Sequence, residues 1–167
     1  AWFNRGRILS YLKKYSAAVT AYETALQGDI EKNDNATRAM ILTNKGVAFW
    51  RLKKYRQALK SIEKATKLNQ NYFAAWYNKG IVLLELKDYK SAFRAYHRAN
   101  SIYPDNYLVW TGIAMALVGN RNYQEALKAV DRALNINPDY ILAQKQKEVI
   151  TQMKAKLADN QIKVNQI

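Results

Sequence analysis

A stretch of 14 residues occurs four times in the chain, and the four copies align without gaps. They read KKYSAAVTAYETAL (13–26), KKYRQALKSIEKAT (53–66), KDYKSAFRAYHRAN (87–100) and RNYQEALKAVDRAL (121–134). The tyrosine at the third position of each copy therefore recurs at spacings of 40, 34 and 34 residues. A fixed period of this length indicates a stack of similar units, because one unit cannot bury its apolar face alone.

Other residues recur with the same period. One column holds small residues (Gly6, Gly46, Gly80 and Ala114), another holds large apolar ones (Trp2, Leu42, Trp76 and Trp110), and prolines end the last two units (Pro104 and Pro138). The pattern resembles the tetratricopeptide repeat (TPR) family. The resemblance implies an all-α fold, a right-handed superhelical solenoid of antiparallel helix pairs. The abundance of Ala, Leu, Lys, Arg and Gln in long stretches also favours helices.

The repeat phase predicts the domain organisation. We expect one TPR array over 1–158 and a polar, frayed tail over 159–167. The array consists of repeats at about 1–32, 39–72, 73–106 and 107–140, followed by a capping helix at about 139–158. In the third repeat, the first helix spans 75–86 and the second about 90–101. The small residues then let the two helix backbones approach closely, beside rings that fill the remaining space.

The chain departs from the family pattern at three places. The column that is usually Leu holds long basic residues, which we expect to be half-exposed with their stems over apolar surface (Arg5, Lys45 and Lys79, with Ile113 as the apolar member). Ile30 and Gln70 replace the proline, which weakens the predicted helix stop. Six extra residues lie within 27–40, where they form a loop or lengthen a flanking helix, and Asp34 or Asn35 is a plausible N-cap.

The last helix has polar residues in the columns that would receive another unit (Gln144, Glu148 and Thr151). A polar outer face is typical of the terminal cap of a repeat array. We therefore expect this helix to close the stack.

The composition argues against catalysis. The chain has no cysteine, one histidine and no Gly-rich phosphate loop, so roles for a nucleophile and a base have almost no candidates. His97 is expected on the solvated side of a second helix. A site built from several histidines is impossible with one His. We expect no enzyme activity, no cofactor and no metal.

The chain has no apolar run of the roughly 18 residues that a membrane span needs, and its first residues carry charge throughout. We therefore expect a cytoplasmic protein without a membrane span. The sequence does not begin with Met and starts within a helical pattern, which suggests a piece of a longer polypeptide.

In the TPR family, the first helices of successive repeats line a concave groove that receives a peptide. An Asn recurs on this stripe at Asn4, Asn44 and Asn78. An amide offers a donor and an acceptor to the main chain of an extended peptide. Rings and a Met would add apolar contact area. The predicted groove residues are Arg7, Tyr11, Thr43, Asn44, Val47, Trp50, Arg51, Tyr77, Asn78, Ile81, Thr111 and Met115. This lining favours a neutral or weakly apolar segment over a strongly acidic one.

One known family mode fits poorly. Co-chaperone TPR domains hold a chaperone's C-terminal carboxylate with two Lys, an Arg and two Asn. The chain has Phe3 and Ala74 where Lys is needed, Arg7 where Asn is needed, and Asn78 where Arg is needed, whereas Asn44 matches. We therefore expect no carboxylate clamp.

The formal net charge is +14, and much of the excess lies in rows on the second helices. The predicted convex anion-binding residues are Arg56, Lys60, Lys64, Lys90, Arg94, Arg98, Lys128 and Arg132. These rows offer an alternative function, binding of nucleic acid or of an anionic surface. The opposing interpretation is a solvated face that Glu63 and Asp131, three residues after Lys60 and Lys128, partly neutralise. A third alternative is a docking or regulatory module of a larger protein.

Overall fold

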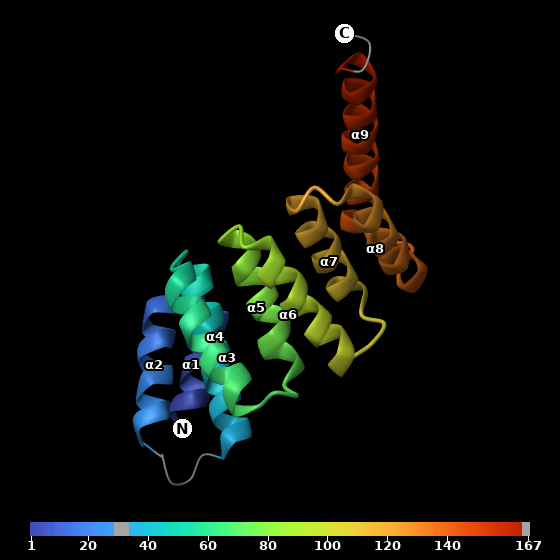
Figure 1. Cartoon of the computed structure of the whole chain (residues 1–167). Coiled ribbons are helices and arrows are strands. Elements are labelled where there is room, and N and C mark those ends of the chain that lie inside the picture. Colours follow the sequence, from blue (N-terminus) through green and yellow to red (C-terminus); the bar gives the residue numbers. More distant parts are fainter. Residues whose placement is uncertain (29–33, 165–167) are drawn as a thin grey trace. The chain divides into compact units, whose positions relative to one another are not determined.

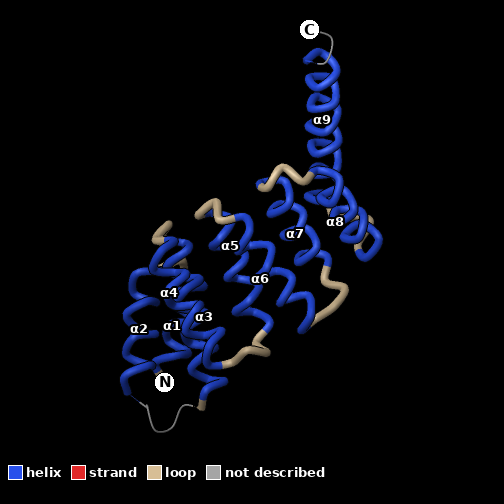
Figure 2. Tube along the Cα trace, viewed as in Figure 1, coloured by secondary structure: helices blue, strands red, loops and turns tan. Residues whose placement is uncertain are grey.

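The computed structural model describes residues 1–28 and 34–164, with side chains to residue 158, and this part of the chain contains nine α-helices and no strand (Figures 1 and 2). The helices are α1 (Trp2–Tyr11), α2 (Tyr15–Gly28), α3 (Asn35–Arg51), α4 (Tyr55–Leu68), α5 (Phe73–Glu85), α6 (Tyr89–Ile102), α7 (Tyr107–Gly119), α8 (Tyr123–Ile136) and α9 (Ile141–Val164). The prediction of an all-α fold is confirmed. The helices fall into two compact units, unit 1 (Ala1–Asp88) and unit 2 (Tyr89–Ile167).

Unit 1 is built from stacked hairpins. Helix α1 packs against α2, and α3 packs against α4. Each second helix also contacts the next first helix, α2 with α3 and α4 with α5, and the first helices α1, α3 and α5 contact one another in turn. The core between them contains fully buried side chains such as Tyr22, Ile41 and Ile62. This is the packing that the 34-residue period predicts.

Unit 2 continues the same alternation. Helix α7 packs against both α6 and α8, and α8 packs against α9. Its buried side chains include Tyr96, Val109, Val130 and Ile150. That the four repeats form one array stays a prediction of the sequence.

The conserved spacing of small residues marks points of contact between helices. A Cβ added at Gly6 would lie 2.5 Å from Cε1 of Tyr22, and one added at Gly46 would overlap the side chain of Ile62 and lie 3.1 Å from the carbonyl oxygen of Ala58. In both pairs the ring or branched side chain comes from the partner helix of the hairpin. The interpretation of the small column as a helix contact is therefore confirmed for Gly6 and Gly46.

The turns between paired helices share one backbone conformation. Lys13, Lys53, Lys87 and Arg121 all have φ near 60°. At the second turn, the N–H of Lys53 donates to the carbonyl of Trp50 (2.8 Å) and the N–H of Lys54 donates to that of Phe49 (2.9 Å). This pair of bonds is a Schellman motif, which satisfies carbonyls at the helix end. Each first helix thus ends in the same way although none of these turns contains glycine.

The extra residues between the first two repeats lengthen a helix. Helix α3 has 17 residues whereas α5 and α7 have 13 each, so four of the additional residues extend the start of α3. Asp34 is its N-cap, and the carboxylate accepts a hydrogen bond of 2.6 Å from the N–H of Thr37. This bond lowers the pKa of Asp34. The predicted N-cap is confirmed, while Ile30 lies outside the described residues.

Two helix ends bear on expectations drawn from the sequence. Helix α4 ends at Leu68 without a proline, because Asn69 adopts an extended conformation and its side-chain oxygen accepts a hydrogen bond of 3.0 Å from the N–H of Asn71. Helix α9 continues to Val164, beyond residue 158, where the sequence predicted a frayed tail.

Candidate binding surfaces

Two asparagines of the predicted groove occupy equivalent positions on neighbouring first helices. Asn44 lies on α3 and Asn78 on α5, and both side chains are half-buried. The Nδ2 of Asn44 donates to the carbonyl of Met40 (2.9 Å), and that of Asn78 donates to the carbonyl of Ala74 (2.8 Å). Each amide is therefore held by its own helix in the same way. Among the described residues, neither Oδ1 has a hydrogen-bond donor.

The two threonines predicted for the groove are instead buried. Thr43 and Thr111 are each 3% exposed, and their hydroxyls donate to carbonyls of their own helices, Ala39 at 2.8 Å and Tyr107 at 2.7 Å. One residue along an α-helix turns the side chain by about 100°. Asn44 therefore lies on the more exposed side of α3, whereas Thr43, one residue earlier, lies on the packed side. The assignment of Thr43 and Thr111 to a groove was wrong.

Trp50 contributes to the core of unit 1 as well as to its surface. The half-buried ring packs against the buried residues, and its Nε1 is buried with no hydrogen-bond acceptor among the described residues. The guanidinium of Arg51, which is exposed, lies 4.7 Å from the centre of the Trp50 ring. Val47 on the same helix is half-buried.

The remaining groove residues of unit 1 are accessible to different degrees. Tyr77 is half-buried and stacks on Phe73, with ring centres 5.9 Å apart, and Ile81 is also half-buried. On α1, Tyr11 is 87% exposed and lines a cavity of about 590 Å³ with Arg7. The exposed side of the first helices in unit 1 therefore combines amides, rings and a cation.

Met115 lies at an apolar cavity of unit 2. Its side chain is 44% exposed and faces a space of about 340 Å³ between α7 and α9. The other lining residues are Val118, Leu142, Lys145, Gln146, Val149 and Ile150. The sequence predicted Met115 but missed the contribution of α9, which we had assigned as a polar cap.

The predicted basic rows lie on exposed or half-exposed helix faces, and they differ in their ion pairs. Arg56, Lys60 and Lys64 on α4 are exposed and have no ion pair with a described residue. On α8, Lys128 pairs with Glu125 (2.8 Å) and Arg132 with Asp105 (2.6 Å). On α6, Lys90 and Arg94 are exposed and Arg98 is half-exposed, and Arg94 and Arg98 contact the hydroxyls of Ser91 and Ser101. The row on α8 is therefore the one that acidic side chains compensate most.

Three family models match the chain, and each is described as tetratricopeptide repeat. They cover residues 1–27, 43–107 and 83–148. The chain belongs to the TPR family. A comparison with curated proteins gives no match.

Solved TPR structures resemble this TPR chain over most of its length. The MamA RS-1 ArsTM double mutant has a TM-score of 0.82 and 23% identity, with 99% of this chain and 91% of that chain covered. YrrB, a TPR protein with an unusual peptide-binding site, has a TM-score of 0.77 and 20% identity over 88% of this chain and 73% of its own. The first TPR of Spaghetti (RPAP3), bound to the HSP90 peptide SRMEEVD, has a TM-score of 0.70 and 19% identity over 74% and 98%. At these identities the likeness shows the fold.

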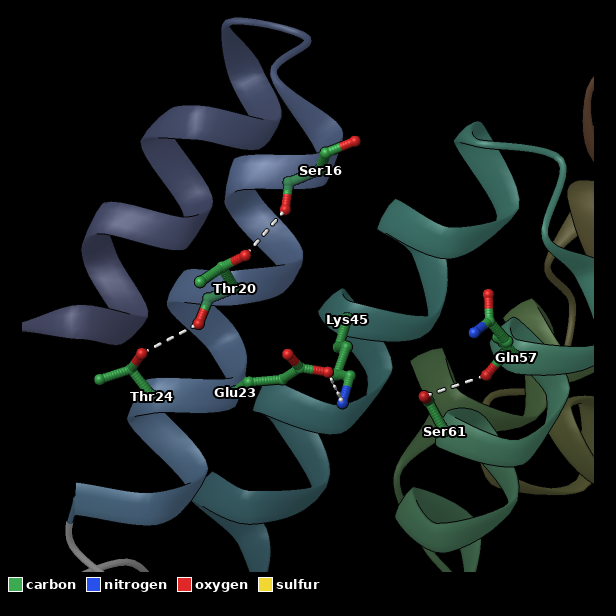
Figure 3. A network of polar contacts seen from close by, with 7 residues as sticks. All are labelled: Ser16, Thr20, Glu23, Thr24, Lys45, Gln57 and Ser61. Carbon is green, nitrogen blue, oxygen red and sulfur yellow. Dashed lines mark hydrogen bonds and ion pairs between the residues drawn. The ribbon is translucent and has the colours of Figure 1, made fainter.

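The TPR frame explains a set of ion pairs that sequence reasoning missed. Lys45 pairs with Glu23 (2.8 Å; Figure 3), Lys79 with Glu63 (3.3 Å) and Lys147 with Asp131 (2.8 Å). In each pair, the acid lies on a second helix and the lysine on the next first helix. Lys45 and Lys79 also lie over the rings of Phe49 and Trp76, at 5.6 and 5.4 Å.

These pairs correct two assignments. Glu63 and Asp131 do not neutralise Lys60 and Lys128 within their helices, because each acid faces a lysine of the following repeat. Two of the three basic residues of the Leu column are also more enclosed than expected, with the side chains of Lys45 and Lys79 only 16% and 20% exposed, whereas Arg5 is exposed. A signal was present in the sequence, since the acids share one column of the TPR alignment and the lysines share another.

His97, the single histidine of this TPR chain, is exposed, and its ring lies 6.0 Å from that of Phe93. Within the described ranges, no group of three or more His, Cys, Asp or Glu side chains gathers to hold a metal ion. No helix in the part of the chain that the structure describes is long and apolar enough to cross a membrane.

Proposed function

We propose that this chain is a non-catalytic protein-interaction module whose first helices bind an extended segment or a helix of a partner protein. The observation that carries the proposal is the matched placement of Asn44 and Asn78 on two helices in contact. Each amide is fixed by a bond to its own helix while its Oδ1 has no donor among the described residues. An extended peptide offers main-chain N–H groups at regular intervals, which suits such a series of acceptors.

The neighbouring side chains support the same use of this face. Tyr77, Ile81 and Val47 supply partly exposed apolar surface beside the amides. Aromatic residues commonly carry much of the binding energy of protein interfaces. Peptide binding is also named for YrrB and for the first TPR of Spaghetti among the structures with this fold.

The proposal excludes a carboxylate clamp. A clamp needs several cations at the groove, and the positions where the family has Lys hold Phe3 and Ala74. We therefore expect the peptide SRMEEVD, which the first TPR of Spaghetti binds, to have no measurable affinity for this chain.

The test combines peptide selection with a matched pair of variants. Peptides selected from a displayed library on the whole chain are labelled, and their affinities are measured by fluorescence anisotropy. Asn44→Ala/Asn78→Ala should weaken binding about tenfold or more, because two hydrogen bonds of about 0.5–1.5 kcal/mol each are lost. Thermal unfolding should remain unchanged within a few degrees.

Thr20→Ala/Thr24→Ala provides the matched control. These threonines also donate to carbonyls of their own helix, at 3.4 and 3.0 Å, but they lie on the second helix α2 (Figure 3). The control should bind as the wild type does. Equal affinity of the asparagine variant and the wild type for every selected peptide would remove the proposal.

The basic row on α4 favours a second function, binding of an anionic polymer such as nucleic acid. Lys60 and Lys64 line a cavity of about 320 Å³ together with Lys45, and Glu23 is the single acid of its lining among the described residues. Three cations against one carboxylate leave the site positively charged. A role as a docking or regulatory module within a larger protein is compatible with either function.

A further inference from the structure

The apolar cavity between α7 and α9 is part of a longer exposed surface. Leu142, Val149, Met153 and Leu157 on α9 are each between 41% and 48% exposed. Their spacing of seven, four and four residues places them on one face of the helix. With a rise of about 1.5 Å per residue, this stripe is about 22 Å long. We call this stripe and the lining of the cavity the α7–α9 surface.

The α7–α9 surface is not the side by which α9 packs on α8. Ala143 is buried, at 0% exposed. Lys147 pairs with Asp131 of α8, and Lys154 contacts Gln124 of α8. The two lysines hold one side of α9 to α8. The exposed stripe is therefore an additional face, which stability of the α8–α9 pair does not require.

The charge beside the stripe is positive. Lys145 lines the cavity, and at about 100° per residue Lys156 lies on the same edge of α9. Neither lysine has an ion pair with a described residue, and the cavity lining contains no acidic side chain. Two cations along one edge of an apolar stripe attract a partner that carries carboxylates at a matching distance from its own apolar ridge.

Gln146 adds a polar requirement to the cavity. Its side chain lines the space between Met115 and Leu142, and its Oε1 is buried without a hydrogen-bond donor among the described residues. A buried acceptor without a donor costs free energy, which a donor from a bound partner would recover. The cavity thus favours an occupant that brings an N–H or O–H group together with apolar side chains.

We propose that the α7–α9 surface binds an amphipathic helix of another protein, with an apolar ridge of about four turns and acidic residues along one edge. The proposal rests on the proposed function, because Met115 belongs to the predicted groove, and it names the chemistry of the partner there. At this surface, an acidic amphipathic partner takes the place of the neutral or weakly apolar partner segment expected from the sequence. That expectation considered the first helices of the repeats and not α9. A second copy of this chain fits less well, because its net charge of +14 would oppose Lys145 and Lys156.

The test uses the whole chain and two synthetic peptides. Both peptides are helical, about 18 residues long, and carry Leu at positions i, i+4, i+7 and i+11. One has Glu along the adjacent edge and the other has Lys at the same positions. Fluorescence anisotropy should show at least tenfold tighter binding of the Glu peptide, with an affinity that falls as salt is raised.

Three variants locate the binding. Val149→Glu should weaken the Glu peptide at least tenfold, whereas Thr151→Glu, on an exposed polar side of α9, should have an effect below threefold. Lys145→Glu/Lys156→Glu changes two exposed side chains and should make the Lys peptide the tighter binder. Circular dichroism must show wild-type helicity for each variant, and the lysine variant decides the matter if Val149→Glu loses helicity.

Several results would overturn this assignment. The first is that neither peptide binds. The second is that the Glu and Lys peptides bind with equal affinities and that Lys145→Glu/Lys156→Glu does not change them. The third is that Asn44→Ala/Asn78→Ala abolishes binding of the Glu peptide whereas Val149→Glu does not. Self-association of the chain that Val149→Glu abolishes would also overturn it, in favour of a second copy. A failure here combined with an intact effect of the asparagine variant on selected peptides would leave the proposed function standing.

Discussion

At the scale of single residues, one absent carbon atom allows α3 and α4 to pack. A Cβ at residue 46 would overlap the side chain of Ile62 and crowd the carbonyl oxygen of Ala58. The Ile62 side chain is completely buried, so any shift of it must be accommodated by the surrounding core.

We therefore predict that Gly46→Ala destabilises the protein. The helix-propensity gain of about 1 kcal/mol opposes an overpacking cost of about 1–3 kcal/mol, so we expect a net loss of up to about 2 kcal/mol. The change in the free energy of unfolding can be measured by urea titration followed by circular dichroism. Gly28→Ala is the control, because nothing lies within 4 Å of an added Cβ there, and it should not destabilise. A Gly46→Ala protein as stable as the wild type would contradict the packing argument.

Adjacent residues also show how finely a helix separates surface from core. Thr43 is buried whereas its neighbour Asn44 is half-exposed, although both carry short polar side chains that bond to a carbonyl four residues earlier. Composition and hydrogen-bonding capacity do not distinguish them. Their angular positions on α3 do.

At the scale of secondary-structure elements, the turns between paired helices carry a backbone cost. Lys53 has φ of 58°, in the left-handed region that a side chain disfavours. The Schellman bonds to Trp50 and Phe49 hold it there.

We predict that Lys53→Gly stabilises unit 1. A lysine in the left-handed conformation costs about 1–2 kcal/mol, which glycine avoids. The added entropy of the unfolded chain costs the glycine variant less, about 0.4–1 kcal/mol of stability. The free energy of unfolding in urea should rise by about 0.5–1 kcal/mol. Lys54→Gly is the matched control, because Lys54 has φ of −87° and should lose stability instead. A destabilised Lys53→Gly protein would show that the lysine side chain outweighs the backbone.

Helix α9 presents two different exposed faces. The residues that would receive another repeat are polar and exposed, as expected of a cap (Gln144, Glu148 and Thr151). On another side, the same helix exposes Leu142, Val149 and Met153. At about 100° per residue this stripe lies on the side of α9 opposite the three polar columns, and the sequence pattern of those columns does not predict it.

At the scale of the whole molecule, the net charge of +14 is distributed unequally between paired and unpaired cations. Lys45, Lys79 and Lys147 are bound in ion pairs between repeats, whereas the row on α4 is not. Lys60 and Lys64 of this row also line a cavity, so the second candidate function concerns this row in particular.

We predict that oligonucleotide binding, if the α4 row supplies it, depends on salt according to the number of phosphates held. If three phosphates are held, the affinity should fall about 40-fold between about 50 and 200 mM salt. Titrations with single- and double-stranded oligonucleotides measure it. Lys60→Gln/Lys64→Gln should reduce the slope of log affinity against log salt by the amount that about two phosphate contacts contribute. Lys128→Gln is the control, because it removes a lysine that is already paired with Glu125. Absence of binding at the lower salt concentration would end this alternative.

The sequence alone determined the period, the helix pairs, the close contacts at small residues and the N-cap of α3. These features depend on residues that are neighbours in sequence or that recur at a fixed offset, so their pattern is visible in one dimension. It also predicted which helices carry Asn44, Asn78 and Met115. It did not separate Thr43 from the surface, because the boundary between core and solvent on a helix depends on which neighbours cover it.

Tertiary structure decided the partners of the charged residues and the lining of the α7–α9 surface. Glu63 has a lysine of its own helix within reach, Lys60, yet it pairs with Lys79 of the next repeat. Met115 forms a cavity with side chains of α9 that are about 30 residues away in sequence. Such contacts depend on how far apart packed helices lie and at what angle side chains leave them, and these quantities are fixed by packing rather than by local pattern.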